Sequence, residues 1–348
     1  MIDYIIVGGG LAGVSFAEQA RHNSKTFVVF NDTSQNSSLI AGGLYNPVIL
    51  KRFTGLANAQ EQLDEMKSFY ANLPIQLQGV YDFPLPVLRK FFSIEEQNNW
   101  FAASDKNTMA PFLSTNLVSK KYSGIDSPLG YGEVMQTGFV DTKRMVIDYH
   151  KFLMDHNLIR HETFDYADLE LKVDSVVYHG IESKNIVFAE GFGINRNPFF
   201  NYLPLDGTKG ELFIIKAENL NLDVIVNTSV FILPLGDNHY KVGATYNWQD
   251  KTDLPTEEGR EELKIRIDEI LTCEYEIITH YAGIRPTVKD RKPLLGAHPN
   301  HKNMFVLNGL GTRGVMQGPA LAKELFKFIE SDFPIRAEYN INRIKKNI

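Results

Sequence analysis

The sequence predicts an α/β fold, α+β overall, in which a Rossmann-like dinucleotide-binding domain is interleaved with a second region rich in strands. Three observations lead to this class. Residues 1–32 contain a strand pattern, a glycine turn, a helix pattern and a second strand pattern. Short alternating runs separated by turn residues occupy 74–138 and 206–279. A last strand, glycine loop and helix in residues 305–329 can return the chain to the first domain.

The first thirty-two residues carry the strongest signal. Asp3 to Val7 is a short apolar run, Val14 to Arg21 has helical character, and Phe27 to Phe30 is typical of a second strand. The glycines between strand and helix stand in G-x-G-x-x-G register, which allows a tight turn, close approach of a pyrophosphate and close packing of the helix on the strand. The N–H groups at the helix start would face the phosphates. The predicted binding residues are Gly8, Gly9, Gly10, Leu11, Ala12 and Gly13.

The polar end of the second strand should supply the side chain that binds a ribose hydroxyl. An acid normally closes this strand in a dinucleotide-binding unit. Asn31 stands at that position here, and Asp32 follows it. Either side chain could form the hydrogen bond, so both are candidates.

Composition and charge describe an ordinary globular chain. Its 348 residues are 43% hydrophobic and 22% charged, which suits two domains with ample cores. The net charge of −6 gives no overall basic field for nucleic acid. The one cysteine, Cys273, excludes a disulfide framework and a multi-cysteine metal site, and no metal is expected. No signal peptide or membrane-spanning segment is predicted, so a reducing, cytoplasmic location fits best.

The segment after the second strand is polar and then rich in glycine. Thr33 to Gly43 is expected to be an irregular loop beside the nucleotide, whose hydroxyls and backbone amides could reach phosphates. An amphipathic helix is expected from Leu56 to Leu73, where apolar residues recur at near-helical spacing. The loop residues predicted to bind the cofactor are Ser37, Ser38, Gly42 and Gly43.

From Pro74 to Gly138, aromatic residues, prolines and short alternating runs predict an inserted antiparallel region. Strands are expected at Val80 to Arg89 and Glu133 to Val140, and a short helix at Ile94 to Ala103. Asp141 should cap a further helix that ends near His156.

The second half of the chain also contains strand patterns interrupted by helix patterns. The strand Ile186 to Ala189 ends at Glu190 and Gly191, which a Rossmann-like sheet would deliver to its ligand-binding edge. Both residues are therefore predicted to contact the nucleotide. Other strands are expected at Tyr166 to Tyr178, Lys209 to Ile215, Val224 to Leu233, Tyr240 to Asn247, Tyr275 to Ile278 and Phe305 to Leu307, with helices at Glu257 to Leu271 and Pro319 to Ile329.

Three glycine-bearing segments, at 8–13, 37–43 and 309–318, require a common explanation. A nicotinamide enzyme would need only the first. The last precedes the final helix, so its amides could face an anionic group. In a flavoenzyme that group would be the edge of the isoalloxazine that gains negative charge on reduction. The residues predicted here are Gly309, Gly311, Thr312, Arg313, Gly314, Val315 and Met316.

On these motifs the chain resembles the D-amino acid oxidase family of FAD-dependent oxidoreductases, which includes glycine oxidase, sarcosine oxidase and the FAD module of a tRNA-modifying enzyme. The matching pieces run in family order over essentially the whole chain. They are VGGGLAG, SSLIAGG, GFVD at 138–141, AEGFG at 189–193, KGELF at 209–213, VGATY at 242–246, AGIRPTVKDRKPLLG at 282–296 and NGLGTRGVMQGPALAKEL at 308–325.

The resemblance implies an FAD-binding Rossmann-like domain and a substrate domain whose mixed, largely antiparallel sheet roofs the flavin. It implies transfer of a hydride equivalent from an amine's α-carbon to flavin N5, followed by hydrolysis of the imine. No cysteine adjoins the flavin motifs, so FAD should be non-covalent. The expected limits are 1–73, 139–205 and 280–348 for the FAD-binding domain, and 74–138 and 206–279 for the substrate domain.

The resemblance implies a catalytic role for Arg285, and Arg313 and Lys209 are two further candidates. Arg285 matches the arginine that grips a substrate carboxylate, for which a planar guanidinium is well suited; the alternative is a structural pair with an acid such as Asp290. Arg313 could serve the flavin or the substrate, or could face solvent. Lys209 is a candidate for activating oxygen beside the flavin, against an ordinary lysine at a strand edge.

The expected partners are a small amine or amino acid and an electron acceptor, either O2 or a carrier. Two alternatives remain: demodification of a carboxymethylaminomethyl-uridine on tRNA, and a flavin-binding protein without turnover. The tRNA reading is not favoured, because the basic runs are only local and are typical of solvated faces. These runs are Lys51-Arg52, Lys120-Lys121, Lys289 to Lys292 and Arg343 to Lys346.

Overall fold

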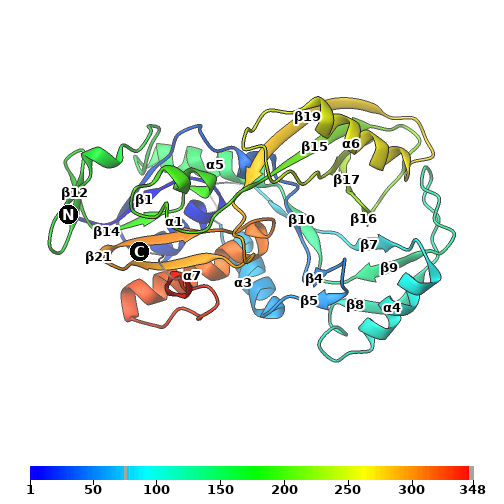
Figure 1. Ribbon diagram of the computed structural model, residues 1–348, viewed down its shortest axis with the longest axis horizontal. Coiled ribbons are helices and arrows are strands. Elements are labelled where there is room, and N and C mark those ends of the chain that lie inside the picture. The colour runs from blue at the N-terminus through cyan, green and yellow to red at the C-terminus, as the bar shows by residue number, and fades with distance from the viewer. Residues whose placement is uncertain (74–76, 78, 345–348) are drawn as a thin grey trace.

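A computed structural model describes residues 1–73, 77 and 79–344. It contains two large sheets, one on the left of Figure 1 among α1, α5 and α7, and one on the right beneath α6. Mixed sheets and helices together confirm the predicted α/β class. Pro74, where the insertion was expected to start, and the basic residues Lys345 and Lys346 lie outside the described part of the chain.

The first sheet forms around β1 (Ile2–Val7), as the N-terminal apolar run predicts. β1 pairs in parallel with β2 (Phe27–Phe30) and with β14 (Ile181–Phe188). β11 (Ile159–Arg160) and β21 (His301–Asn308) add to these in parallel. The carboxyl ends of the parallel strands therefore meet at one edge, where such a sheet binds its ligand. Antiparallel pairing adds β20 (Leu294–His298), β13 (Val176–Tyr178) and β12 (Glu170–Leu171).

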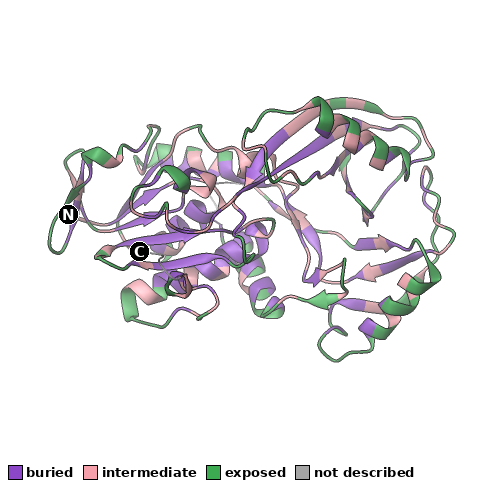
Figure 2. Cartoon of the chain, viewed as in Figure 1, coloured by how far each residue is buried: buried purple, intermediate pink, exposed green. Residues whose placement is uncertain are grey.

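Helix α1 (Leu11–His22) packs against the first sheet together with α7 (Gly314–Ser331). The ring of Phe16 in α1 lies 5.2 Å from the ring of Tyr4 in β1 and 6.2 Å from that of Phe326 in α7. These side chains belong to a continuous core, and Figure 2 shows the strands and inward faces of these helices as buried. The adjoining helices are α3 (Ala59–Ala71) and α5 (Thr142–Asp155), the latter capped by Asp141 as predicted.

Helix α7 begins at Gly314, five residues before the start expected at Pro319. Pro319 therefore lies inside the helix, where its missing N–H leaves the carbonyl four residues earlier without a helical partner. That carbonyl belongs to Val315, and the Tyr70 hydroxyl of α3 donates a hydrogen bond to it at 3.1 Å. A side chain from another helix thus makes the internal proline tolerable.

The second sheet is mixed and largely antiparallel. Its order is β19-β15-β18-β17-β16-β7-β9-β8, and the only parallel pairing within that series joins β16 and β7. Helix α6 (Glu257–Asp268) begins beside β15, and α4 (Ile94–Ser104) packs near β8. The strands are β7 (Val87–Lys90), β8 (Leu113–Val118), β9 (Tyr131–Val134), β15 (Thr208–Lys216), β16 (Ile225–Asn227), β17 (Phe231–Gly236), β18 (His239–Gly243) and β19 (Glu276–Arg285).

Several elements differ from their expected limits. The loop at 33–43 contains a one-turn helix, α2 (Ser37–Ile40). The strand expected at 80–89 divides into β6 (Asp82–Pro84) and β7, because two prolines near the break lack ladder donors. The strand expected at 133–140 divides at Gln136, which has φ of 57°, into β9 and β10 (Gly138–Val140). Two short antiparallel pairings lie outside the large sheets: β3 (Leu44–Tyr45) pairs with β10, and β4 (Val48–Ile49) pairs with β5 (Thr54–Gly55). The domain limits given above stay a prediction.

We expect Gly13→Ala to destabilise the FAD-free protein by about 1–3 kcal/mol, the usual cost of overpacking. A Cβ at Gly13 would lie 1.8 Å from the Gly8 carbonyl oxygen, so helix and turn would have to separate. Denaturant unfolding would measure the change. Gly193→Ala is the matched control, because its Cβ would meet ordinary contacts at 3.7 Å. Equal stability of the two variants would contradict this account of the turn.

Candidate functional site: a cavity between the two sheets

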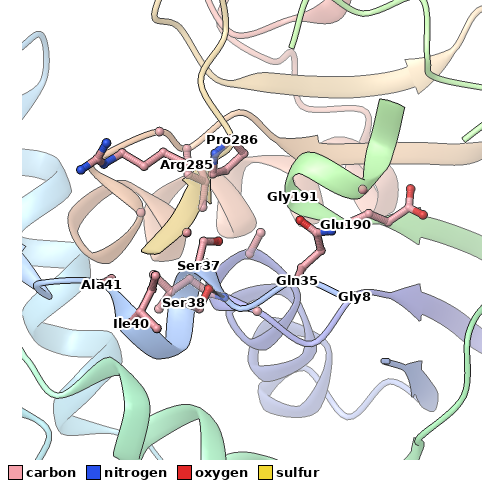
Figure 3. A pocket seen from close by; sticks show the side chains of 18 of the residues that line it. Gly8, Gln35, Ser37, Ser38, Ile40, Ala41, Glu190, Gly191, Arg285 and Pro286 are labelled. Atoms are coloured by element: carbon pink, nitrogen blue, oxygen red, sulfur yellow. Dashed lines mark hydrogen bonds between the residues drawn. The ribbon is translucent and has the colours of Figure 1, made fainter. Parts of the chain in front are cut away.

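A cavity of about 520 Å³ lies between the carboxyl ends of β1, β2 and β14 and the inner face of β15, β18 and β19. In Figure 3, Glu190 and Arg285 lie toward opposite sides of this cavity, with Ser37 and Ser38 of α2 between them. Among the predicted cofactor residues, those that line it are Gly8, Gly9, Gly10, Leu11, Ala12, Asn31, Asp32, Ser37, Ser38, Gly42, Gly43, Glu190, Gly191, Gly311, Thr312, Gly314 and Val315.

The glycine turn is held by side chains of two neighbouring segments. Gly9 N–H donates to Asn31 Oδ1 at 2.7 Å, and Leu11 N–H donates to Ser38 Oγ at 3.0 Å. A Cβ at Gly10 would meet the Ser38 side chain at 2.9 Å, so the turn and α2 lie in close contact. No acid occupies the first turn of α1 or of α7. Both helix starts therefore keep the positive end of the helix dipole available for an anion.

The two ribose candidates have different partners. Asn31 Nδ2 donates to the Asp32 carbonyl at 2.9 Å, while its Oδ1 holds Gly9, so this amide fixes the turn. The Asp32 carboxylate accepts the Ser34 N–H at 3.0 Å and the Ser34 hydroxyl at 2.6 Å. Burial alone would raise the pKa of Asp32, but these hydrogen bonds outweigh it and lower the pKa. Which of the two binds a ribose stays a prediction.

Glu190 lies in the wall at the nucleotide end of the cavity. Its carboxylate accepts a hydrogen bond from Asn197 Nδ2 at 2.8 Å and another from the Tyr166 hydroxyl. Burial raises the pKa of Glu190 to about 7, because these hydrogen bonds offset the lost hydration only in part. This carboxyl consequently changes charge close to neutral pH.

The C-terminal loop contributes to the cavity through some of its predicted residues. A Cβ at Gly311, where φ is +55°, would meet nothing within 4 Å, so space lies beside the backbone there. Asn308, which sequence reasoning did not single out, donates to the Gly191 carbonyl at 3.0 Å and accepts the Gly309 N–H at 2.7 Å. It thereby joins the two loops. The predicted residues that do not line the cavity are Gly13, Gly309, Arg313 and Met316.

Arg285 lies at the other end of the cavity, at the end of β19. Its Nη1 donates to the carbonyls of Lys209 at 3.3 Å and Thr245 at 3.2 Å, and its guanidinium lies 4.5 Å from the ring centre of Tyr246. Burial lowers its pKa. Among the described residues no carboxylate forms an ion pair with it, and Asp290 pairs with Arg343 at 2.9 Å instead. A cation in this environment lacks the compensating anion that burial of a charge normally requires.

The structure corrects the prediction for Lys209, whose side chain does not line the cavity. Lys209 precedes Gly210 on β15, and successive strand residues point to opposite faces. Gly210 lines the cavity, so Lys209 points toward the face where α6 begins. Its side chain is 0% exposed, and its Nζ lies 2.5 Å from Asp250 Oδ2 and 3.6 Å from Glu211 Oε1. A sequence motif locates the residue but not the face that its side chain occupies.

Sequence reasoning also missed three strand glycines in the cavity wall. Gly210 and Gly283 are direct neighbours across β15 and β19, and Gly243 ends β18. A Cβ at Gly210 would lie 2.0 Å from the Arg285 guanidinium, and one at Gly283 would lie 2.3 Å from Ile40. A glycine inside a strand pattern marks a close approach of this kind, so the KGELF, VGATY and AGIRP runs did carry the signal.

A strand–glycine turn–helix unit and a cavity roofed by a second sheet define a dinucleotide-binding enzyme fold. The family model described as "DAO: FAD dependent oxidoreductase" matches residues 3–327, and the chain belongs to this family. FAD is accordingly its cofactor. The residues present fit it: two helix starts free of acids, glycines whose Cβ atoms would crowd the turn, and open space beside Gly311.

Individual relatives agree with the family. The tRNA 5-methylaminomethyl-2-thiouridine biosynthesis bifunctional protein MnmC of Marinobacter nauticus is 21% identical over 92% of this chain, which spans 54% of that relative. Glycine oxidase of Pseudomonas putida is 29% identical over 34% of this chain and 33% of its own length. The chain thus spans about half or less of these relatives.

Solved structures share the fold. Glycine oxidase from Bacillus cereus superposes with a TM-score of 0.78 at 18% identity, covering 96% of both chains. Iminodiacetate oxidase from Chelativorans superposes with a TM-score of 0.77 at 15% identity, covering 97% of this chain and 98% of the other. Within the described ranges, no helix is long and apolar enough to cross a membrane, and no group of three His, Cys, Asp or Glu side chains could hold a metal ion.

We expect Lys209→Met to destabilise the protein by about 3–5 kcal/mol, because it leaves the buried Glu211 carboxylate and Asp250 without their cation. Chemical denaturation would measure this change. Lys216→Met on the same strand is the control, since Lys216 pairs with Glu218 in solvent and its loss should leave the midpoint unchanged. Similar midpoints for both variants would show that the buried ion pair contributes little.

We expect the FAD-free protein to lose stability between about pH 4.5 and pH 7, in part through Glu190. The folded protein holds this proton with a pKa of about 7, against an ordinary value of 4.5, so the contribution is complete at low pH and is lost as the pH rises. Glu190→Gln should remove this part of the slope in unfolding free energy, whereas the exposed Glu170→Gln should not. Parallel curves for the parent and Glu190→Gln would contradict the assignment.

Proposed function

We propose that this FAD-dependent oxidoreductase oxidises the C–N bond of an amine that carries a carboxylate, an amino acid or an N-substituted amino acid. The observation that supports this most directly is Arg285, a desolvated guanidinium in the cavity wall with no ion-pair partner in the described chain. A carboxylate could bind its fork through two parallel hydrogen bonds. The donor atoms of the substrate would then be fixed relative to the cofactor.

The proposed cofactor site extends from the glycine turn to the C-terminal loop. The starts of α1 and α7, together with Ser37 and Ser38, would hold the anionic parts of FAD, and Glu190 or Asp32 would lie near its nucleoside end. FAD supplies the acceptor for a hydride equivalent, and the imine left on the substrate is hydrolysed by water. Asn31 would act indirectly, by holding Gly9.

The protein's own part in this reaction is to orient the substrate and exclude water. The lining acids Asp32, Glu162 and Glu190 come from the segments after β2, β11 and β14, on the side of the first sheet. The wall around Arg285 is formed by Gly210, Leu212 and Gly243. A neutral amine needs no side-chain base there before hydride transfer, so the absence of a nearby lining carboxylate is compatible with the chemistry.

A second candidate is oxidation of a modified uridine on tRNA. It is supported by the relative from Marinobacter nauticus, whose match covers 92% of this chain. Retention of tRNA at low salt, together with no flavin reduction by any free amino acid, would favour this candidate over the first. Comparing peroxide release with dye reduction for one substrate would then distinguish O2 from a carrier as the electron acceptor.

Replacement of Arg285 tests the proposed function. We expect Arg285→Gln to bind FAD normally and to lower kcat/KM for a carboxylate-bearing amine by at least about 100-fold, because a charge-assisted bidentate contact is lost. Stopped-flow flavin reduction without oxygen would measure it. Arg144→Gln, an exposed arginine near Asp148, is the matched control.

Unchanged kinetics in Arg285→Gln would refute the carboxylate role. If the FAD-loaded parent is reduced by no amine or tRNA at all, a flavin-binding protein without turnover becomes the better reading.

A further inference from the structure

Two more arginines lie near the Arg285 end of the cavity. The guanidinium of Arg291 lies 5.5 Å from the ring centre of Trp248, and Arg313 caps the start of α7. The loops that carry them are in contact, because the Gly311 N–H donates to the Pro286 carbonyl at 3.1 Å. Burial lowers the pKa of Arg313, and the neighbouring charge of Arg291 lowers it further. Within the described chain neither forms an ion pair.

The nearby acids are already engaged. Asp290, next to Arg291 in the chain, accepts hydrogen bonds from Arg343 at 2.9 Å and from the Lys292 N–H at 3.0 Å. Asp206 pairs with Lys251 at 3.2 Å. Lys289 and Lys292 are exposed and add positive charge to the same loop. This loop therefore has an excess of positive charge that no described acid of the chain neutralises there.

Two aromatic rings connect this positive region to Arg285. Tyr246 and Trp248 are two residues apart, on either side of Asn247, which bridges to Lys209 as a strand would. Tyr246 contacts Arg285 and Trp248 contacts Arg291, and the two residues are 54% and 38% exposed. The two cation–ring contacts therefore belong to one short segment of the chain.

We propose that Arg291 and Arg313 form a second anion subsite, which binds a second acidic group of the substrate beside the cavity residues Thr312 and Gly314. The inference rests on the proposed function, in which Arg285 holds the first carboxylate. The substrate is then a small amine with two anionic groups: the carboxylate near the reacting carbon and a remote carboxylate or phosphate. Such a ligand would neutralise the mutual repulsion of the two arginines and stabilise their arrangement.

Binding of two matched probes tests the subsite without turnover. Glutarate and butyrate have similar chains but carry two and one carboxylates, and each can be titrated into the FAD-loaded protein by the change in the flavin spectrum. We expect the parent to bind glutarate at least about tenfold more tightly than butyrate, the effect of one added charge-assisted contact. Arg291→Gln and Arg313→Gln should each remove this preference, whereas Arg266→Gln on α6 should keep it.

The remaining outcomes separate the two proposals. Equal affinities for glutarate and butyrate in the parent, with both weakened by Arg285→Gln, would overturn the second subsite and leave the proposed function intact. Failure of both probes to bind the parent would count against both proposals. Phosphoserine and serine, compared as amine substrates, distinguish a phosphate from a carboxylate as the remote group. The small-molecule assignment would be overturned if the parent retains tRNA, Arg291→Gln does not, and the parent shows no preference for glutarate over butyrate.

Discussion

The site depends on the half-buried guanidinium of Arg285, which has no ion-pair partner among the described residues. The guanidinium of Arg285 is supported by two backbone carbonyls and one aromatic ring, and these neutral partners compensate only part of the lost hydration. Placing a charge in this environment is costly, so the surrounding structure must hold it rigidly. In the proposed function, a carboxylate ligand would supply the anionic partner that this guanidinium lacks.

The opposite face of the sheet provides the rigidity. The Lys209 carbonyl accepts from Arg285, while the Lys209 side chain on the other face is fixed by Asp250 and Glu211. Glu211 also accepts from Thr256 at the start of α6, and its own N–H donates to Thr245 Oγ1. Both carbonyls that hold Arg285 are therefore tied to a buried ionic network that never reaches the cavity. On that face Lys209 pairs with Asp250 and Glu211, whereas on the cavity face Arg285 has no ion-pair partner among the described residues.

The sequence could predict the parts of the fold that depend on local patterns. The strand–turn–helix at the N-terminus and the Asp141 cap form where expected, whereas the strands expected at 80–89 and 133–140 each divide into two. Sequence patterns gave the wrong helix limit or side-chain direction where a contact with a residue far away in the sequence decides the structure. The start of α7 before Pro319 depends on Tyr70, and the direction of Lys209 depends on register with β19. The strand expected at Tyr275 to Ile278 covers only the start of β19, because Gly283, needed for close approach, weakens the strand pattern further along.

The central claim is that the cavity recognises its substrate through a carboxylate at Arg285. Anaerobic titration of the FAD-loaded protein with paired amines tests this most directly, each pair differing only by that group: glycine and methylamine, sarcosine and dimethylamine, glutamate and 4-aminobutyrate. The account predicts that the flavin absorbance is lost with at least one amine bearing its carboxylate on the reacting carbon, and persists with the partner that lacks it. Equal bleaching by both members of a pair would contradict the account.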